Sequence, residues 1–156
     1  MTKAASELAE QVAALALEKG LLVAVAESLT SGAIASRLGA AQDASVWFAG
    51  GVVAYAPETK FRVLNVDRGP VANARCAVQM AKGCLVLLGA DLAVAVTGVG
   101  GPDPDDGRPP GTVYVATSSP TGEIVDQHKF DGAPAEVVAQ ATVVALETLL
   151  AAANKL

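Results

Sequence analysis

The stretch that decides the fold is Val23-Ala24-Val25-Ala26-Glu27-Ser28-Leu29-Thr30-Ser31-Gly32. Its apolar run ends at two polar residues, and an alanine-rich pattern that is typical of a helix follows at once. This pattern predicts a strand, a tight turn and a helix. The hydroxyl of Ser28 would then stand beside free backbone N–H groups at a helix N-terminus. Such a serine can cap the helix, help to bind an anion or act as a nucleophile, and residues elsewhere in the chain must decide.

Composition bounds the class of protein. Of the 156 residues, 52% are hydrophobic and 17% are charged, which predicts a globular fold with a single domain over residues 1–156. The net charge is −5 and no cluster of Lys and Arg is present, so we expect no nucleic-acid partner. No apolar run approaches the roughly 20 residues that span a bilayer, and the N-terminus is polar, unlike a signal peptide. We therefore expect a cytoplasmic protein without a membrane partner.

The two cysteines, Cys76 and Cys84, lie in one predicted helix. These positions are eight residues apart, which is a rise of about 12 Å in a helix, whereas a disulfide needs Cα atoms within about 7 Å. We therefore expect both cysteines to be reduced residues of the core. The chain also lacks a paired Cys/His spacing for a metal, and we expect neither a metal nor a cofactor.

Helices and strands alternate along most of the chain. Periodicity, glycines and prolines predict helices at residues 8–16 with a stop at Gly20, 30–38, 57–63, 77–88 with a stop at Gly89, and 137–150 with Pro134 in the first turn. Strands are predicted at residues 21–26, 46–55, 92–97, 112–118 and 123–130. The pair Gly50-Gly51 indicates a bulge or a close backbone approach in the second strand.

This order of elements predicts an α/β protein, namely a three-layer α/β/α sandwich. The continuous apolar runs at residues 21–26 and 92–97 are typical of buried parallel strands. The last two strands form a hairpin around Pro120-Thr121-Gly122, which requires at least one antiparallel strand. We therefore expect a mixed, mostly parallel sheet of about five strands.

Ser28 has two interpretations when its local sequence is considered alone. Capping a helix is the commonest role of a serine at this position. The other role is that of a nucleophile whose oxyanion is held by N–H groups of the following turn. The segment does not match the G-x-S-x-G elbow, because Ala26 and Thr30 stand at its glycine positions. It is not a Walker A loop either, because no Gly-Lys-Ser/Thr follows.

A serine nucleophile needs a base, and two residues are candidates. His128 is the only histidine, but it lies in an apparently exposed polar stretch of the hairpin, which leaves a Ser-His-Asp triad unsupported. Lys60 follows Tyr55 in a short helix and would be a surface lysine by default. A lysine in a pocket can act as a base because burial lowers its pKa. Tyr55 would then relay a proton or orient the lysine.

The loop Thr97-Gly98-Val99-Gly100-Gly101-Pro102 follows a predicted buried strand. Such loops bind ligands in open α/β sheets, and glycines let backbone N–H groups approach a phosphate or a carboxamide. The acidic run Asp103, Asp105 and Asp106 follows, and a metal-dependent hydrolase is one alternative interpretation of it. Two prolines and the missing Glu at the twelfth loop position argue against an EF-hand, so a solvated loop is the simpler interpretation.

Three blocks together resemble one family. Residues 26–32, from Ala26 to Gly32, are similar to its signature A-E-S-C-T-G-G. Residues 48–60 are similar to F-x-G-G-x-V-x-Y-x-x-x-x-K, and residues 96–102 with 110–113 are similar to T-G-I-A-G-P…G-T-V. On these blocks the chain resembles the C-terminal domain family of the competence/damage-inducible protein CinA, which includes nicotinamide-nucleotide amidases, in a stand-alone form.

The resemblance implies hydrolysis of the carboxamide of nicotinamide mononucleotide, which gives nicotinate mononucleotide and ammonia without a metal or cofactor. The family's roles carry over onto Ser28 as nucleophile, Lys60 as base and Tyr55 as the nearby tyrosine. N–H groups at the start of the following helix would hold the oxyanion. Arg108 and the matching residues of the two loops would line the substrate site, namely Glu27, Thr30, Ser31, Gly32, Thr97, Gly98, Gly100 and Gly101.

Residues 130–138 depart from the family's pattern F-x-G-D-R-x-x-x-R. Pro134 and Val138 stand where the two arginines would be. The charge for the substrate phosphate would then come from a neighbouring subunit of a homo-oligomer, such as a dimer, or from another arginine, namely Arg37, Arg62, Arg75 or Arg108. The alternative hypothesis is a catalytically weak or repurposed homologue that binds a nucleotide or a protein partner.

Overall fold

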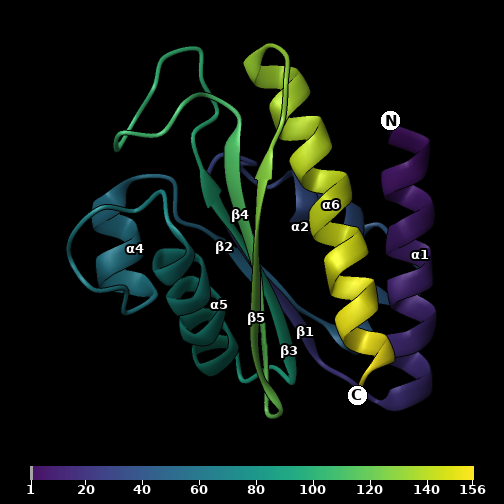
Figure 1. Cartoon of the computed structure of the whole chain (residues 1–156). Coiled ribbons are helices and arrows are strands. Elements are labelled where there is room, and N and C mark those ends of the chain that lie inside the picture. Colours follow the sequence, from purple (N-terminus) through teal and green to yellow (C-terminus); the bar gives the residue numbers. More distant parts are fainter. Residues whose placement is uncertain (1) are drawn as a thin grey trace.

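A computed structural model describes residues 2–156 of the chain (Figure 1). Its strands are β1 (Val23–Glu27), β2 (Phe48–Val53), β3 (Leu92–Gly98), β4 (Thr112–Ser119) and β5 (Gly122–Lys129). Its helices are α1 (Thr2–Lys19), α2 (Ala33–Gly39), α3 (Ala44–Trp47), α4 (Pro57–Val63), α5 (Ala74–Leu88) and α6 (Pro134–Asn154).

The strands form one sheet in the order β2-β1-β3-β4-β5. β1 pairs in parallel with β2 and β3, whereas β4 pairs antiparallel with β3 and β5. Four strands therefore run in one direction and β4 runs against them. Helices α1, α2 and α6 cover one face of the sheet, and α4 and α5 cover the other (Figure 1). The predicted three-layer sandwich with a mixed sheet is confirmed.

Large and small apolar residues alternate in the two central strands. Valines and Leu92 of β1 and β3 face the core shared with α1 and α6, whereas the alanines of these strands face α5. Successive residues of a strand point to opposite faces. Thr97, two residues after Ala95, therefore lies on the α5 face, and Ser28 follows Ala26 in the same way. On this face α5 buries Cys76 and Cys84, which are both free, as the sequence predicts.

The turn between β1 and α2 is longer than the sequence predicts. Ser31 and Gly32 have φ angles of 50° and 102°, which lie in the left-handed region. A right-handed helix cannot contain these two residues, so α2 begins at Ala33 and not at about residue 30. The turn therefore spans residues 28–32 and leaves Ser28 outside the helix.

The start of β2 also differs from the prediction. Residues 44–47 form α3, and the strand begins at Phe48 and not at residue 46. Trp47 is fully buried, and its indole Nε1 donates a hydrogen bond to the Gln42 carbonyl at 2.9 Å. The buried indole and its hydrogen bond hold residues 44–47 in a helical turn. Four residues are too few to show the period of a helix in the sequence.

The glycine pair of β2 has both predicted features. Its register with β1 skips Ala49, so the strand is irregular at this point. A Cβ atom at Gly51 would lie 2.7 Å from Cγ1 of Val25, closer than atoms can pack. β2 therefore lies against β1 with a close backbone approach, which brings the end of β2 beside the end of β1.

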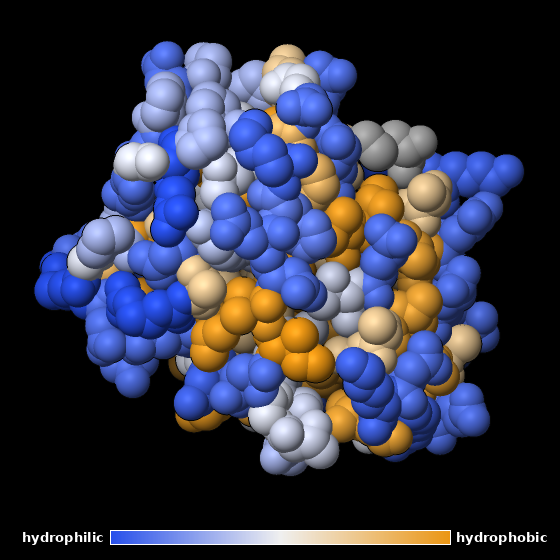
Figure 2. Space-filling model, in the orientation of Figure 1, coloured by the Kyte–Doolittle hydropathy of each residue, from blue (hydrophilic) through white to orange (hydrophobic). Residues whose placement is uncertain are grey.

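Helix α6 is long and apolar enough to cross a membrane by length and composition alone. Val137, Ala141, Leu146 and Leu149 are nevertheless buried in the core with β3, β4 and α1. Figure 2 shows apolar residues along α6 and the adjoining side of α1, where these helices pack together. Core helices of globular proteins share these properties, and α6 is a helix of this core.

Helices α4 and α5 approach each other at Gly83. A Cβ atom at this position would clash with the backbone carbonyl of Leu64. The N–H of Leu64 donates to the Lys60 carbonyl at 3.1 Å, so the contact supports the helical turn that carries Lys60. A glycine inside a helix usually destabilises it by about 1 kcal/mol relative to alanine, and here close packing requires the glycine.

Replacement Gly83→Ala is expected to destabilise the protein by about 1–3 kcal/mol, although alanine is the better helix former. The new methyl group would push α4 away from α5. Urea unfolding measures the effect. Gly39→Ala is the control, because its Cβ would meet only the Phe48 ring at 3.8 Å, and it should change stability by less than about 0.5 kcal/mol. A Gly83→Ala protein as stable as the wild type would contradict the close packing.

Candidate active site

Ser28 lies in the turn at the carboxyl end of β1, near the centre of the sheet. The side chain is buried, and the residue is only 6% exposed. The Ser28 carbonyl accepts the N–H of Ser31 at 3.1 Å, and the Thr30 carbonyl accepts the N–H of Ala33 at 2.9 Å. These two bonds close the turn and hold Ser28 in a fixed position before α2.

Lys60 meets Ser28 inside the protein. Its Nζ atom lies 2.8 Å from Oγ of Ser28, although the two residues are 32 positions apart in sequence. The same Nζ donates to the carbonyls of Ala54 at 2.8 Å and Tyr55 at 3.0 Å. Lys60 is 1% exposed, so it is a core residue and not the surface lysine that its local sequence suggests.

The path of the chain after β2 explains how Lys60 reaches the serine. The Ala54 N–H donates to the Glu27 carbonyl at 2.8 Å, which keeps the end of β2 beside the end of β1. Ala56 is extended, and Pro57 then starts α4 in its first turn, where proline is tolerated. One turn of helix brings Lys60 back toward the carbonyls of residues 54 and 55 and toward Ser28.

Burial is the main influence on the charge of Lys60. It lowers the pKa of the lysine from its ordinary value, while Cys76 and the carboxylate of Asp106 act in the opposite direction. None of the ion pairs found among residues 2–156 includes Lys60. A neutral amine has two N–H donors and one lone pair. If the two carbonyls take the N–H donors, the lone pair can accept the hydroxyl proton of Ser28.

Glu27 has a separate task at the start of α2. It is fully buried, and its Oε1 and Oε2 accept the N–H groups of Ile34 at 3.1 Å and Ala35 at 2.8 Å. Both carboxylate oxygens thus satisfy the helix N-terminus. In the structure Glu27 therefore anchors the N-terminus of α2, whereas the family resemblance implies that it contacts the substrate.

The N–H groups at the start of α2 are also occupied. Those of Ile34 and Ala35 donate to Glu27, so an oxyanion would have to use the turn itself. Within residues 2–156, no hydrogen bond is found for the N–H groups of Leu29, Thr30 and Gly32. Oγ1 of Thr30 is likewise buried without a partner in the described part of the chain. The turn beside Ser28 therefore presents several unused donors.

The glycine-rich loop that follows β3, residues 99–111, lies over the turn of residues 28–32, which is called the serine turn below. A Cβ atom at Gly100 would be 3.7 Å from Cβ of Leu29, so the two loops are in contact distance. The chain doubles back at residue 111, where Gly111 N–H donates to the Val99 carbonyl at 2.8 Å. Thr97 is 1% exposed, and its Oγ1 donates to the Val71 carbonyl at 2.9 Å. The hydroxyl of Thr97 thus holds a neighbouring loop.

Three other candidates lie apart from the Ser28–Lys60 contact. Tyr55 is 65% exposed, and its backbone carbonyl is the atom that reaches Lys60. Arg108 is exposed and lies over the ring of Tyr114, with Cζ 5.8 Å from the ring centroid. His128 is in β5, which β3 and β4 separate from β1, and it stacks on Phe130. The structure therefore places Lys60, and not His128, beside the serine.

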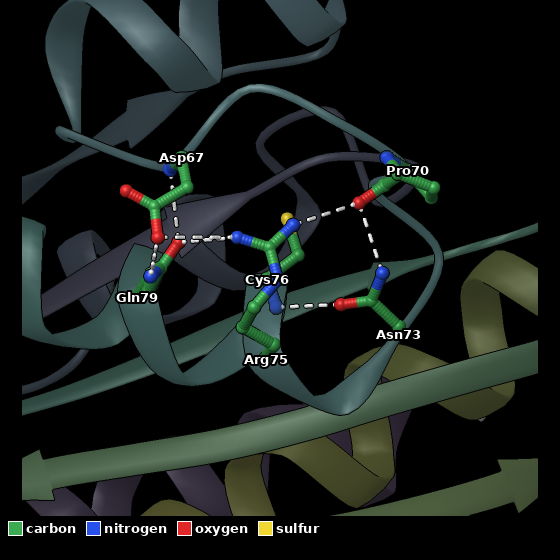
Figure 3. A network of polar contacts seen from close by, with 6 residues as sticks. All are labelled: Asp67, Pro70, Asn73, Arg75, Cys76 and Gln79. Carbon is green, nitrogen blue, oxygen red and sulfur yellow. Dashed lines mark hydrogen bonds and ion pairs between the residues drawn. The ribbon is translucent and has the colours of Figure 1, made fainter.

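The segment between α4 and α5 contacts Thr97 through the Val71 carbonyl, a neighbour that the sequence does not predict. Figure 3 shows how it is fastened to the first turns of α5. Asn73 caps α5 by accepting the Cys76 N–H at 2.8 Å and donates to the Pro70 carbonyl at 2.9 Å. Gln79 exchanges two hydrogen bonds with Asp67, at 2.8 and 2.9 Å. The spacing of Asn73 before a helix is the one sequence signal for this arrangement.

The acidic run has contacts that its local sequence does not reveal. Oδ2 of Asp106 accepts the N–H groups of Val71 and Ala72, and Oδ1 of Asp105 accepts the Asp106 N–H. Among the described residues, no group of three or more His, Cys, Asp or Glu side chains is arranged to hold a metal ion. The carboxylate of Asp106 instead connects two loops near Lys60.

The four arginines considered for a phosphate differ in their contacts. Arg62 pairs with Glu58, and Arg75 pairs with Asp67. Neither Arg37 nor Arg108 takes part in the ion pairs found within residues 2–156. Arg37 lines a cavity of about 190 Å³ together with Val138, and Arg108 belongs to the loop over the serine turn. These two guanidinium groups remain available to an anion.

Comparisons with known proteins agree on one family. The model of the CinA C-terminal domain matches residues 5–153. A putative competence-damage inducible protein of Desulforamulus reducens is 40% identical over 131 residues, which cover 81% of this chain and 32% of that protein. A CinA-like protein of Geobacter sulfurreducens is 41% identical over 145 residues, which cover 88% and 35%. The chain thus spans about a third of the length of these curated relatives.

Solved structures share the whole fold. A competence-damaged protein (CinA) superfamily protein from Klebsiella pneumoniae 700603 superposes with a TM-score of 0.92 at 32% identity, covering 97% of this chain and 99% of that one. The competence/damage inducible protein CihA of Agrobacterium tumefaciens gives a TM-score of 0.87 at 32% identity, with 97% and 96% covered.

Replacement Lys60→Met should remove a pH dependence of stability. Burial lowers the pKa of Lys60 from 10.5, so the unfolded chain binds more protons than the folded one between the lowered pKa and pH 10.5. The free energy of unfolding of the wild type minus that of Lys60→Met should therefore rise as the pH rises through this window. This stabilisation is lost again as the pH falls through the lowered pKa. Urea unfolding at a series of pH values measures the difference.

The exposed residue Lys82 provides the control for this comparison. The wild type and Lys82→Met should differ by an amount that stays nearly constant over the same range. A constant difference between the wild type and Lys60→Met would show that the buried lysine keeps its ordinary titration.

Proposed function

Because the chain belongs to the CinA C-terminal domain family, we propose that it is an amidase that hydrolyses the carboxamide of nicotinamide mononucleotide to nicotinate mononucleotide and ammonia. The family includes nicotinamide-nucleotide amidases. The observation that carries the proposal is the buried contact of 2.8 Å between Nζ of Lys60 and Oγ of Ser28. We further propose that the enzyme is cytoplasmic and needs no cofactor.

The first step is attack of the serine on the amide. Oγ of Ser28 forms a bond to the carboxamide carbon, and the lone pair of Lys60 takes the hydroxyl proton. Burial supports this role because it lowers the pKa of Lys60 and favours the neutral amine. The carbonyls of Ala54 and Tyr55 keep the amine directed at the serine.

The oxyanion would be stabilised by N–H groups of the serine turn. Those of Leu29, Thr30 and Gly32 lie on this turn, and no hydrogen bond is found for them within residues 2–156. Donors that are already in place stabilise the developing charge without reorganisation. The buried Oγ1 of Thr30 adds a further hydrogen-bond donor on the same turn.

Three further proton transfers through Lys60 complete the reaction. Lys60 passes the proton to the leaving nitrogen, the C–N bond breaks, and ammonia departs from an ester on Ser28. Water then attacks the ester carbon while Lys60 accepts its proton. The bond between this carbon and Oγ of Ser28 breaks as Lys60 returns the proton to Oγ, which releases nicotinate mononucleotide. Tyr55, whose carbonyl accepts a hydrogen bond from Lys60, is proposed to assist proton transfer.

Arg108 is the proposed partner of the substrate phosphate. It has no ion pair within residues 2–156 and belongs to the loop that lies over the serine turn. Guanidinium groups bind phosphate through two parallel hydrogen bonds. Gly98 at the end of β3, Gly100 and Gly101 of the same loop, and Ser31 of the turn would line the nucleotide.

A second candidate function is binding of the nucleotide without turnover. It is favoured by the cavity of about 190 Å³ between α2 and α6, where Val138 contributes an apolar side chain at a position that the family pattern gives to arginine. Such a protein would be a catalytically weak or repurposed relative that binds a nucleotide or a protein partner. Measured ammonia release decides between the two functions, because turnover rejects the second one.

Replacement Ser28→Ala should reduce ammonia release from nicotinamide mononucleotide by at least about a thousandfold, because it removes the nucleophile. Lys60→Arg should cause a comparable loss, since a guanidinium stays protonated and cannot accept the serine proton. Ser36→Ala on the surface of α2 is the matched control and should keep wild-type activity. Equal rates for Ser28→Ala and the wild type would reject the serine mechanism.

Replacement Arg108→Ala should raise KM for nicotinamide mononucleotide by about tenfold or more and change kcat little, because the lost contact binds a remote phosphate. Arg62→Ala removes an exposed arginine that already pairs with Glu58, and its KM should stay near that of the wild type. An unchanged KM in Arg108→Ala, with a raised KM in Arg37→Ala, would move the phosphate to the cavity beside Val138.

A further inference from the structure

Asp106 connects two loops that are far apart in sequence. It lies in the segment between β3 and β4 with a left-handed φ of 50°. Its Oδ2 accepts the N–H of Val71 at 3.0 Å and the N–H of Ala72 at 3.1 Å. Two N–H donors on one ionised oxygen make charge-assisted hydrogen bonds, which are stronger than neutral ones. The carboxylate therefore fastens the segment before α5 to the loop after β3.

The same segment is held from its other side by Thr97. Oγ1 of Thr97 donates to the Val71 carbonyl at 2.9 Å, so both polar atoms of the Val71 backbone have side-chain partners. Thr97 and Ser28 follow Ala95 and Ala26, which are partners in the parallel pair of β3 and β1. The fastened segment therefore lies at the carboxyl ends of the strands that carry the proposed site.

The Asp106 carboxylate also acts on the charge of Lys60, although none of the ion pairs found within residues 2–156 joins the two side chains. Nζ of Lys60 contacts the Ser28 hydroxyl and the two carbonyls after β2. The Cys76 thiol of α5 and the Asp106 carboxylate influence its charge without a hydrogen bond to it within residues 2–156. Burial raises the pKa of the Cys76 thiol, which is therefore neutral near neutral pH. Burial lowers the pKa of Lys60, and the Asp106 carboxylate counteracts part of that effect.

We propose that Asp106 is a positioning residue of the site, which holds the Val71–Ala72 segment in place and provides the counter-charge for Lys60 while the lysine carries the proton of Ser28. The role in proton transfer rests on the proposed amidase function. The two parts of the proposal have separate physical origins, since the first needs a hydrogen-bond acceptor and the second needs a charge. Asn at position 106 keeps an acceptor and removes the charge, whereas Ala removes both.

The charge is tested by the titration of Lys60 itself. Heteronuclear NMR of protein with labelled lysine follows the ε-methylene signal of Lys60, which is identified by its loss in Lys60→Met. In Asp106→Asn the midpoint should move to lower pH than in the wild type, because the ammonium loses its counter-charge. Asp103→Asn removes the same charge from an exposed position of the same loop and should leave the midpoint in place. Identical midpoints in all three proteins would overturn the counter-charge.

The hydrogen bonds are tested by amide hydrogen exchange at Val71 and Ala72. Exchange at both positions should be at least about tenfold faster in Asp106→Ala than in the wild type. It should change much less in Asp106→Asn, whose amide oxygen can still accept both bonds. Unchanged exchange in Asp106→Ala would overturn the positioning role, and Asp106→Asn keeps the charge test available if the alanine variant does not fold.

The pH profile of ammonia release links these results to catalysis. The rise of kcat/KM with pH should move to lower pH in Asp106→Asn, in parallel with the NMR midpoint, and a purely structural role would leave its position unchanged. A shifted NMR midpoint with an unshifted profile would overturn the link to proton transfer. If the wild type releases no ammonia, the amidase proposal fails, while titration and exchange still report the contacts of Asp106.

Discussion

The burial of Lys60 is the constraint on which the site depends. A buried amine without a carboxylate in contact must satisfy its N–H groups elsewhere, because unpaired polar groups in a protein interior are costly. Here the carbonyls of residues 54 and 55 provide the acceptors, and they do so only because β2 ends beside β1 and α4 turns back at once. Ser28 fills the remaining position around Nζ. The backbone path thus determines the direction of the amine, and burial lowers its pKa.

The rest of the fold supplies the room for this arrangement. Alanines on one face of the central strands let α5 lie close to the sheet, and Gly83 lets the end of α4 lie close to α5. The valine-rich opposite face packs against α1 and α6, which have no part in the proposed chemistry. The core between the sheet and helices α1 and α6 therefore stabilises the sheet, and the core on the α5 face encloses the site.

Much of the fold and the central pair of the site could be predicted from the sequence, because local patterns and motifs mark them strongly. Apolar runs, proline and glycine placed the strands and most helices, and family motifs paired Ser28 with Lys60. The short helix α3 escaped prediction because four residues contain no period. The anchoring of α2 by Glu27 depends on the left-handed turn between them, and the contact of Asp106 with Val71 joins residues 35 positions apart. Local sequence patterns do not encode such backbone paths. The same reason explains why Lys60 looked like a surface residue.

The partners of Lys60 are main-chain atoms, and this affects how the site can be lost in evolution. No substitution at residue 54 or 55 deletes a carbonyl, so a missense change there leaves the acceptors in place. The vulnerable positions are those that set the backbone path, such as Gly51 and Gly83, where any side chain would collide with its neighbours. Inactivating variants are therefore expected at such glycines as well as at Ser28 and Lys60, and a screen restricted to polar residues would overlook the glycines.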